Sequence, residues 1–116
     1  MTQVTIFHNP RCSKSRETLA LLESKDVSIQ IVEYLKQVPD AATISELLAK
    51  LGISARELMR TKEEEYKAQG LNNPELTEAQ LIAAMVATPK LIERPIVLAK
   101  GKAAIGRPPE NVLAIL

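Results

Sequence analysis

The stretch QVTIFHNPRCSKSRETLALL, residues 3–22, decides how this chain folds. It opens with an apolar, β-branched run typical of a buried strand, whereas residues 18–22 have the apolar character of a helix. The segment between them, FHNPRCSKSR at residues 7–16, holds the only cysteine, Cys12, and the only histidine, His8. We therefore expect Cys12 to lie at a strand-to-helix junction, close to the N-terminus of the helix.

A helix N-terminus favours the thiolate form of Cys12. Unpaired backbone N–H groups and the positive end of the helix dipole stabilise an anion there, and Arg11, Lys14 and Arg16 add positive charge. In such surroundings the pKa of a thiol falls from about 8.5 to roughly 3.5–7.5. A lone cysteine is often a small buried hydrophobe, but the polar neighbours of Cys12 disfavour a core position. We interpret Cys12 as a nucleophile.

The composition predicts a single domain over residues 1–116, long enough to bury a core without disulfides or metal. Fifteen basic and fourteen acidic residues give a formal charge of +1, which excludes a global field that recruits nucleic acid. No apolar run reaches the roughly 20 residues needed to span a bilayer, and a single thiol suits a reducing compartment. We expect a cytoplasmic monomer without metal, nucleic-acid or membrane sites.

The order of the predicted elements is β-α-β, helices, β-β-α. A second strand at residues 27–34 follows the first helix and completes a right-handed βαβ unit with parallel strands. The middle of the chain is helical, and Gly52 is placed to end its first helix. The charged run at residues 62–67 predicts a solvated helical face. Helices are expected to start at three segments with capping-box spacing, residues 43–46, 54–57 and 77–80.

Two short apolar runs, residues 95–99 and 103–105, predict antiparallel strands joined by a tight turn with Gly101. A last helix is expected to start at residues 107–110, with proline in its first turn. A mixed four-stranded sheet flanked by helices is the simplest way to bury these apolar faces. The fold class is therefore α/β.

Several arginines stand at the boundaries of predicted elements, where a side chain can turn towards a pocket. A guanidinium stays charged and offers a planar fork of donors that suits a tetrahedral oxyanion. An isolated surface arginine more commonly serves solubility or a salt bridge, so these residues suggest a site only together with Cys12. They are Arg60, Arg94 and Arg107.

The spacing around Cys12 excludes two cysteine chemistries. A phosphatase-type anion loop needs arginine where this chain has Thr18, and a dithiol redox motif needs cysteine where it has Ser15. A monothiol nucleophile that an external thiol regenerates remains. His8 either stabilises the thiolate or is a loop residue without chemistry, and Ser15 either donates to the sulfur or caps the helix.

The segments HNPRCSKSR, LMR, ERPIV and GRPP, at residues 8–16, 58–60, 93–97 and 106–109, resemble the glutaredoxin-dependent arsenate reductase family, in particular its short bacterial members. The resemblance runs over essentially the whole chain. It implies a thioredoxin-like fold with a helical insert and a cis peptide bond between Arg94 and Pro95.

The resemblance also implies an activity, the reduction of arsenate to arsenite, and the residues that carry it. Glutathione is the implied co-substrate, glutaredoxin restores the cysteine, and no cofactor is bound. Alternatives are a monothiol oxidoreductase for another oxyanion or for a glutathione mixed disulfide, and a redox-responsive regulator that binds RNA polymerase. In this family the matching cysteine attacks arsenate, three arginines hold the oxyanion, and a histidine and a serine favour the thiolate; these roles fall on Cys12, Arg60, Arg94, Arg107, His8 and Ser15.

Overall fold

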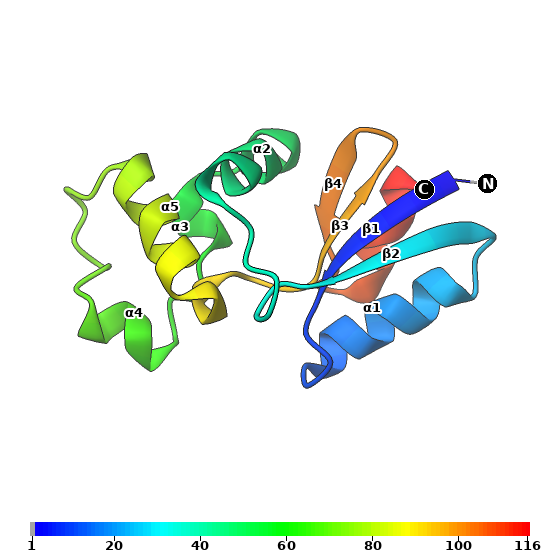
Figure 1. Ribbon diagram of the computed structural model, residues 1–116, viewed down its shortest axis with the longest axis horizontal. Coiled ribbons are helices and arrows are strands. Elements are labelled where there is room, and N and C mark those ends of the chain that lie inside the picture. The colour runs from blue at the N-terminus through cyan, green and yellow to red at the C-terminus, as the bar shows by residue number, and fades with distance from the viewer. Residues whose placement is uncertain (1) are drawn as a thin grey trace. The chain divides into compact units, whose positions relative to one another are not determined.

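The computed structural model describes residues 2–116, which form two compact units (Figure 1). Unit 1 comprises residues 2–37 and 94–116, and unit 2 comprises residues 38–93. The single domain expected over residues 1–116 stays a prediction.

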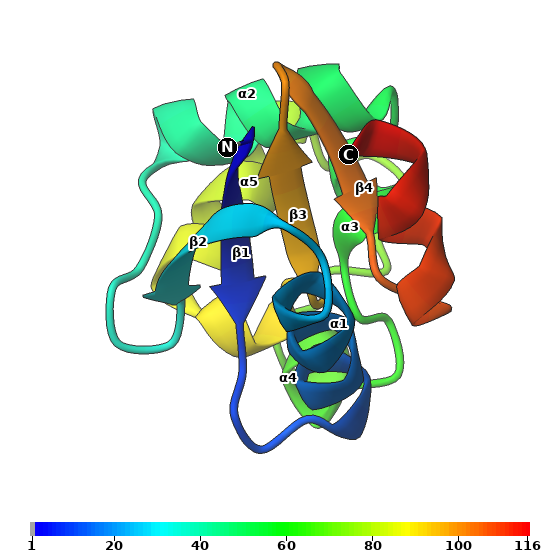
Figure 2. The ribbon, with the colours of Figure 1, turned by 90° about the vertical axis from the view of Figure 1, so that its right-hand side faces the viewer.

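Unit 1 contains a mixed four-stranded sheet with the strand order β2-β1-β3-β4 (Figure 2). Strand β1 (Thr2–His8) pairs in parallel with β2 (Val27–Glu33), and α1 (Ser13–Glu23) connects them. On its other side β1 pairs antiparallel with β3 (Ile96–Ala99), which in turn pairs antiparallel with β4 (Lys102–Ile105). The predicted βαβ unit and the mixed sheet are confirmed.

Helix α1 and the C-terminal 3₁₀ helix η2 (Pro109–Ile115) pack in one core with strands β1 and β3. Residues two apart in a strand point to the same face, which brings the apolar side chains of the two strands together. This packing fixes the start of α1 and the segment after β4. The core residues are Val4, Ile6, Leu22, Val97, Ala99, Val112 and Ile115.

The hairpin of β3 and β4 turns over two residues, Lys100 and Gly101, whose φ angles are 52° and 75°. Two successive positive φ angles are typical of a type I′ turn, whose twist matches that of the flanking strands. The predicted hairpin is confirmed, although Lys102 already belongs to β4 and pairs with Ala99.

Unit 2 consists of short helices. The helices α2, α3 and the 3₁₀ helix η1 all contact α5, which makes α5 the centre of the unit. The elements are α2 (Ala41–Leu51), α3 (Ala55–Leu58), α4 (Glu64–Ala68), α5 (Glu78–Ala87) and η1 (Pro89–Leu91).

Two of the three predicted capping boxes are present. The side chains of Ser54 and Thr77 accept hydrogen bonds from the backbone N–H groups of Glu57 and Gln80, and the side chains of these two residues accept from the cap backbone in return. Reciprocal bonds of this kind satisfy donors that a helix start leaves unpaired. They start α3 and α5 at the predicted residues.

The third predicted box, at residues 43–46, is wrong. Helix α2 begins earlier, because the carboxylate of Asp40 caps it by accepting from the backbone N–H of Thr43 at 2.8 Å. An Asp side chain serves as an N-cap as well as a Thr side chain does. The predicted end of the helix is confirmed, since Gly52 adopts the left-handed conformation with φ 68°.

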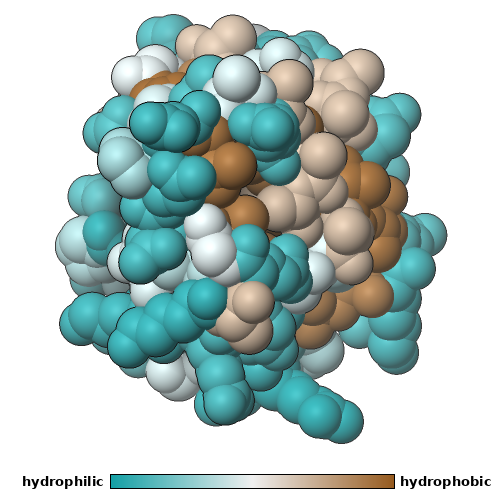
Figure 3. All heavy atoms as spheres, turned by 90° about the vertical axis from the view of Figure 1, so that its left-hand side faces the viewer, coloured by the Kyte–Doolittle hydropathy of each residue, from teal (hydrophilic) through white to brown (hydrophobic). Residues whose placement is uncertain are grey.

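Figure 3 shows one face of the molecule, on which hydrophilic side chains cover much of the surface and hydrophobic ones gather along one side. Within residues 2–116, no helix is long and apolar enough to cross a membrane. Over the same described range, no three His, Cys, Asp or Glu side chains are grouped so that they could hold a metal ion.

Candidate active site

Cys12 is the N-cap residue of α1 and is buried. Its backbone N–H donates to the carbonyl of Asn9 at 3.0 Å, and its own carbonyl accepts from the N–H of Arg16 at 3.0 Å. Two side chains hold the preceding loop: Asn9 Oδ1 accepts from the Arg11 N–H, and Arg16 Nη1 donates to the Pro10 carbonyl, both at 3.0 Å. The predicted strand-to-helix junction is confirmed, and local hydrogen bonds define it.

The surroundings of the thiol favour the thiolate. Burial raises the pKa of Cys12, but the backbone N–H groups of Ser15 and Lys14 and the positive charges of Arg94 and Arg107 lower it, and the resulting pKa lies below that of an ordinary cysteine. The backbone contribution is the one expected for an anion at a helix N-terminus. The arginine contribution comes from distant parts of the sequence.

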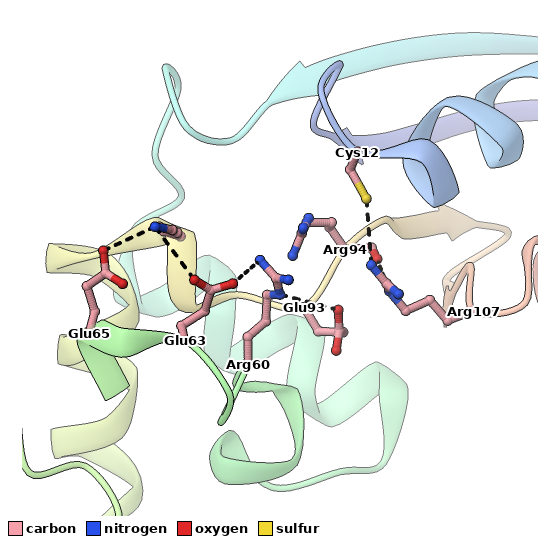
Figure 4. Close-up of polar contacts among 8 residues, drawn as sticks. Cys12, Arg60, Glu63, Glu65, Glu93, Arg94 and Arg107 are labelled. Atoms are coloured by element: carbon pink, nitrogen blue, oxygen red, sulfur yellow. Dashed lines mark hydrogen bonds and ion pairs between the residues drawn. The ribbon is translucent and has the colours of Figure 1, made fainter. Parts of the chain in front are cut away.

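Two arginines lie beside the sulfur in Figure 4. Nη2 of Arg107 donates to Sγ of Cys12 at 3.6 Å, and Nε of Arg107 donates to the backbone carbonyl of Arg94 at 2.8 Å. The Nε and Nη1 atoms of Arg94 are buried, whereas Arg107 is exposed. The amide of Asn111 donates to the carbonyl of Arg107 at 3.0 Å and steadies that backbone.

Both arginines precede a cis proline. The cis bond between Arg94 and Pro95, which the resemblance implies, is confirmed. A second cis bond joins Arg107 to Pro108. The sequence gives no signal for it, because an X–Pro bond that becomes cis reads like any other.

Gly106 packs tightly between α1 and the segment before β3. Its N–H donates to the carbonyl of Pro95 at 2.9 Å. A Cβ at this position would lie 2.8 Å from Cγ of Pro95 and closer still to Oγ1 of Thr18. We infer that Gly106 positions Arg107, which follows it. Reasoning from the sequence missed this role, although the GRPP segment contains the glycine.

His8 and Ser15 contact each other in the buried part of the junction. Nδ1 of His8 lies 2.6 Å from Oγ of Ser15, which also accepts from the backbone N–H of Asn9 at 3.0 Å. Burial lowers the pKa of His8, Glu33 opposes this, and Arg16 lowers the pKa further, with a net decrease. The hydrogen bond between the two side chains links the end of β1 to the first turn of α1. That the side chains of His8 and Ser15 stabilise the thiolate stays a prediction.

Arg60 belongs to unit 2, directly after α3 and its C-cap residue. Its backbone N–H donates to the carbonyl of Leu91 at 2.7 Å, and the neighbouring residue Met59 forms a β-bridge with Ile92. These contacts fix the backbone from which the guanidinium projects.

The guanidinium of Arg60 is paired with carboxylates (Figure 4). Its Nη1 lies 2.6 Å from Oε1 of Glu63, and its Nε lies 4.0 Å from Oε1 of Glu93. Nζ of Lys90 contacts Oε2 of Glu63 at 3.6 Å and Oε2 of Glu65 at 3.3 Å. The side chain of Glu63 is only 18% exposed and Tyr66 is buried, so the solvated face predicted for residues 62–67 is wrong at these two positions. Glu63 stands three positions after Arg60, a spacing that favours an ion pair, and this signal in the sequence was missed.

Unit 1 therefore brings together five of the six predicted site residues: Cys12, His8, Ser15, Arg94 and Arg107. A thiolate with two guanidinium groups beside it can attack an electrophilic centre that carries anionic oxygens, because the guanidinium groups stabilise the negative charge on those oxygens.

Known proteins resemble this chain over its full length. The ArsC family matches residues 7–115. An arsenate reductase of Neisseria meningitidis serogroup A is 50% identical over 117 residues, covering 100% of both chains. The protein YfgD of Escherichia coli K12 is 60% identical over 115 residues, covering 98% of this chain and 97% of that protein. The solved structure of an arsenate reductase from Vibrio cholerae has a TM-score of 0.97 and 50% identity, and covers 99% of this chain and 98% of that one.

The fold and the site define a small thioredoxin-like α/β protein with one buried thiol of lowered pKa. The chain belongs to the ArsC family. Both the family resemblance and the fold class predicted from the sequence are thereby confirmed.

Proposed function

We propose that this protein is an arsenate reductase with Cys12 as its nucleophile. The observation that carries the proposal is the placement of Arg94 and Arg107 beside a buried sulfur whose pKa they lower. Membership of the ArsC family and the arsenate reductase names of relatives at 50% identity support arsenate as the substrate.

The first step is attack of the Cys12 thiolate on arsenic(V). A sulfur–arsenic bond forms, an arsenic–oxygen bond breaks, and the departing oxygen leaves as water after protonation. Arg94 and Arg107 stabilise the remaining anionic oxygens with charged hydrogen bonds. Arg60 is proposed as a third oxyanion ligand on the strength of the family resemblance.

Glutathione then supplies the remaining electrons. Its thiolate attacks the Cys12 sulfur, the sulfur–arsenic bond breaks, and the electron pair goes to arsenic, which leaves as arsenite in the +3 state. Cys12 is left in a mixed disulfide with glutathione, which glutaredoxin reduces to restore the thiol. The scheme needs one protein cysteine and no bound cofactor. Its dependence on glutathione makes the cytoplasm the proposed location.

NADPH consumption tests this function. The assay contains arsenate, glutathione, glutaredoxin and glutathione reductase, and compares the wild-type protein with Cys12→Ser at equal folded concentration. We expect turnover in the wild type, loss of turnover when glutathione or glutaredoxin is omitted, and background rates for Cys12→Ser. Retention of activity in Cys12→Ser contradicts the mechanism. A wild-type protein that is folded, reactive towards iodoacetamide and inactive with arsenate points to another oxyanion or to a mixed-disulfide substrate.

A further inference from the structure

A hollow of about 220 Å³ in unit 1 plays no part in the first step of the mechanism. One wall is the loop after β1 and the other is the end of β2 with the residues that follow it. We call it the β1–β2 hollow. Its lining residues are His8, Asn9, Pro10, Arg11, Glu33, Leu35 and Lys36.

The β1–β2 hollow lies where two parallel strands end. His8 and Glu33, the last residues of β1 and β2, are partners in the register of this parallel pair, so the two strands end at the same edge of the sheet. Binding residues commonly lie on loops that a rigid sheet positions, and both walls of the hollow are such segments. The position therefore suits a binding site.

The loop that lines the β1–β2 hollow leads directly into Cys12. Asn9, Pro10 and Arg11 form the wall, and the Cys12 N–H donates to the Asn9 carbonyl at 3.0 Å, which closes the loop into a tight turn. A molecule held in the hollow thus lies against the segment that carries the nucleophile. This suits a second substrate better than it suits an unrelated effector.

The hollow presents two cations, one carboxylate and one apolar side chain. Arg11 and Lys36 are exposed, and Leu35 is 42% exposed. Oε1 of Glu33 lies 3.8 Å from Nζ of Lys36, and the side chain of Lys36 is 80% exposed. A long ion pair of this kind in solvent contributes little to stability. Both of its charges are therefore available to a ligand.

We propose that the β1–β2 hollow binds glutathione. The peptide carries two carboxylates and one ammonium group, which complement the charges of Arg11, Lys36 and Glu33. A peptide bound in the hollow lies beside the loop that leads to Cys12, the residue with which its thiol must react after arsenate. The inference rests on the proposed function, which requires a glutathione thiol but does not say where the peptide binds.

Binding of S-methylglutathione, which has no free thiol, tests the site without chemistry. We expect calorimetric titration to give a Kd for the wild type that rises about threefold to tenfold in Lys36→Gln and in Glu33→Gln, since each loses one charged contact with the peptide. The double variant Arg11→Gln/Lys36→Gln should bind more weakly than Lys36→Gln alone. The matched control is Lys25→Gln at an exposed lysine two residues before β2, which should leave the Kd unchanged. Circular dichroism checks that each variant is folded.

The outcomes separate this inference from the proposed function. Absence of S-methylglutathione binding to the wild type, or equal Kd values in the wild type, Lys36→Gln and Glu33→Gln, overturns the site even if arsenate turnover is intact. Conversely, binding that depends on Lys36 and Glu33 supports the site even if arsenate turnover fails.

Discussion

The two units hold their arginines in opposite electrostatic settings. In unit 1, Arg107 donates to the sulfur of Cys12, and together with Arg94 it lowers the pKa of that thiol. In unit 2, the guanidinium of Arg60 faces the carboxylates of Glu63 and Glu93. A cation beside a thiol stabilises the thiolate before any substrate arrives, whereas the charge of a cation beside a carboxylate is already offset. The proposed oxyanion ligands should therefore have separable effects.

The largest expected effect distinguishes these settings directly. Arg94→Ala should lower kcat/KM for arsenate by roughly 10²–10³-fold, as removal of an oxyanion donor does elsewhere, and should also raise the pKa of Cys12, since Arg94 lowers it in the wild type. Arg60→Ala should lower kcat/KM without changing that pKa. The pH dependence of iodoacetamide alkylation measures the pKa independently of turnover.

The direction in which the alkylation rate changes with pH follows from the lowered pKa of Cys12. The wild-type rate should stay high below the pKa of an ordinary thiol and fall as pH decreases through the lowered value, because only the thiolate reacts. In Arg94→Ala the fall should occur at higher pH. Arg94→Lys is the control, since it keeps the charge and loses the fork of donors. If the alkylation midpoints of Arg94→Ala and Arg60→Ala are equal, the two arginines do not differ in their effect on the pKa of Cys12, which contradicts the difference between the units.

A second contrast concerns two glycines, one in each unit. Gly106→Ala in unit 1 forces a Cβ against Thr18 and Pro95 and should cost about 1–3 kcal/mol of stability by overpacking. It should also lower kcat/KM, because Arg107 follows directly. In unit 2, a Cβ at Gly52 meets nothing within 4 Å, but φ is +68°, so Gly52→Ala should cost about 1–2 kcal/mol through backbone conformation alone.

Urea unfolding and arsenate kinetics measure these two effects separately. Gly52→Ala should leave the kinetics unchanged. The double variant Thr18→Ala/Gly106→Ala should recover part of the stability lost in Gly106→Ala, because it removes one of the two obstructing side chains. Unchanged kinetics in Gly106→Ala contradict the positioning role.

Parts of the fold that depend on nearby residues could be predicted from the sequence, and parts that depend on distant residues could not. The βαβ start, the hairpin at Gly101 and the capping boxes at Ser54 and Thr77 were predictable, because each depends on residues a few positions apart. The placement of Cys12 at a helix start was predictable for the same reason. The convergence of the arginines on Cys12 was not, since Arg107 reaches the sulfur from 95 positions away and only the family resemblance linked the two.

Acidic and capping residues show where a local pattern is ambiguous. Glu63 lies in a charged run that a periodicity argument assigns to solvent, yet it is paired with Arg60 and Lys90. Asp40 and Thr43 are both good N-caps, and the sequence does not rank them. The structure assigns the cap to Asp40.

The Asp40 cap leads us to expect a smaller effect, on the stability of unit 2. Asp40→Ala should reduce the free energy of unfolding by about 1 kcal/mol, the usual cost of a lost N-cap. Ser45→Ala, within the segment wrongly predicted as a capping box, is the control and should have a much smaller effect. Urea unfolding at neutral pH measures both. Equal losses in the two variants contradict Asp40 as the cap.

The smallest expected effect concerns the charge that offsets Arg60. In the wild type, Nη1 of Arg60 lies 2.6 Å from Oε1 of Glu63. Glu63→Gln keeps a hydrogen-bond acceptor at this position but removes the negative charge that competes with arsenate for the guanidinium. If Arg60 binds the oxyanion, KM for arsenate should fall roughly twofold to fivefold, in line with the modest strength of partly exposed ion pairs. The alkylation profile of Cys12 should stay unchanged, because the charges that lower its pKa belong to unit 1.

The exposed neighbour Glu64 supplies the control, Glu64→Gln. A rise in KM in Glu63→Gln alone means that Glu63 orients Arg60 more than it neutralises it, and then the contrast between the units is one of geometry, not of charge.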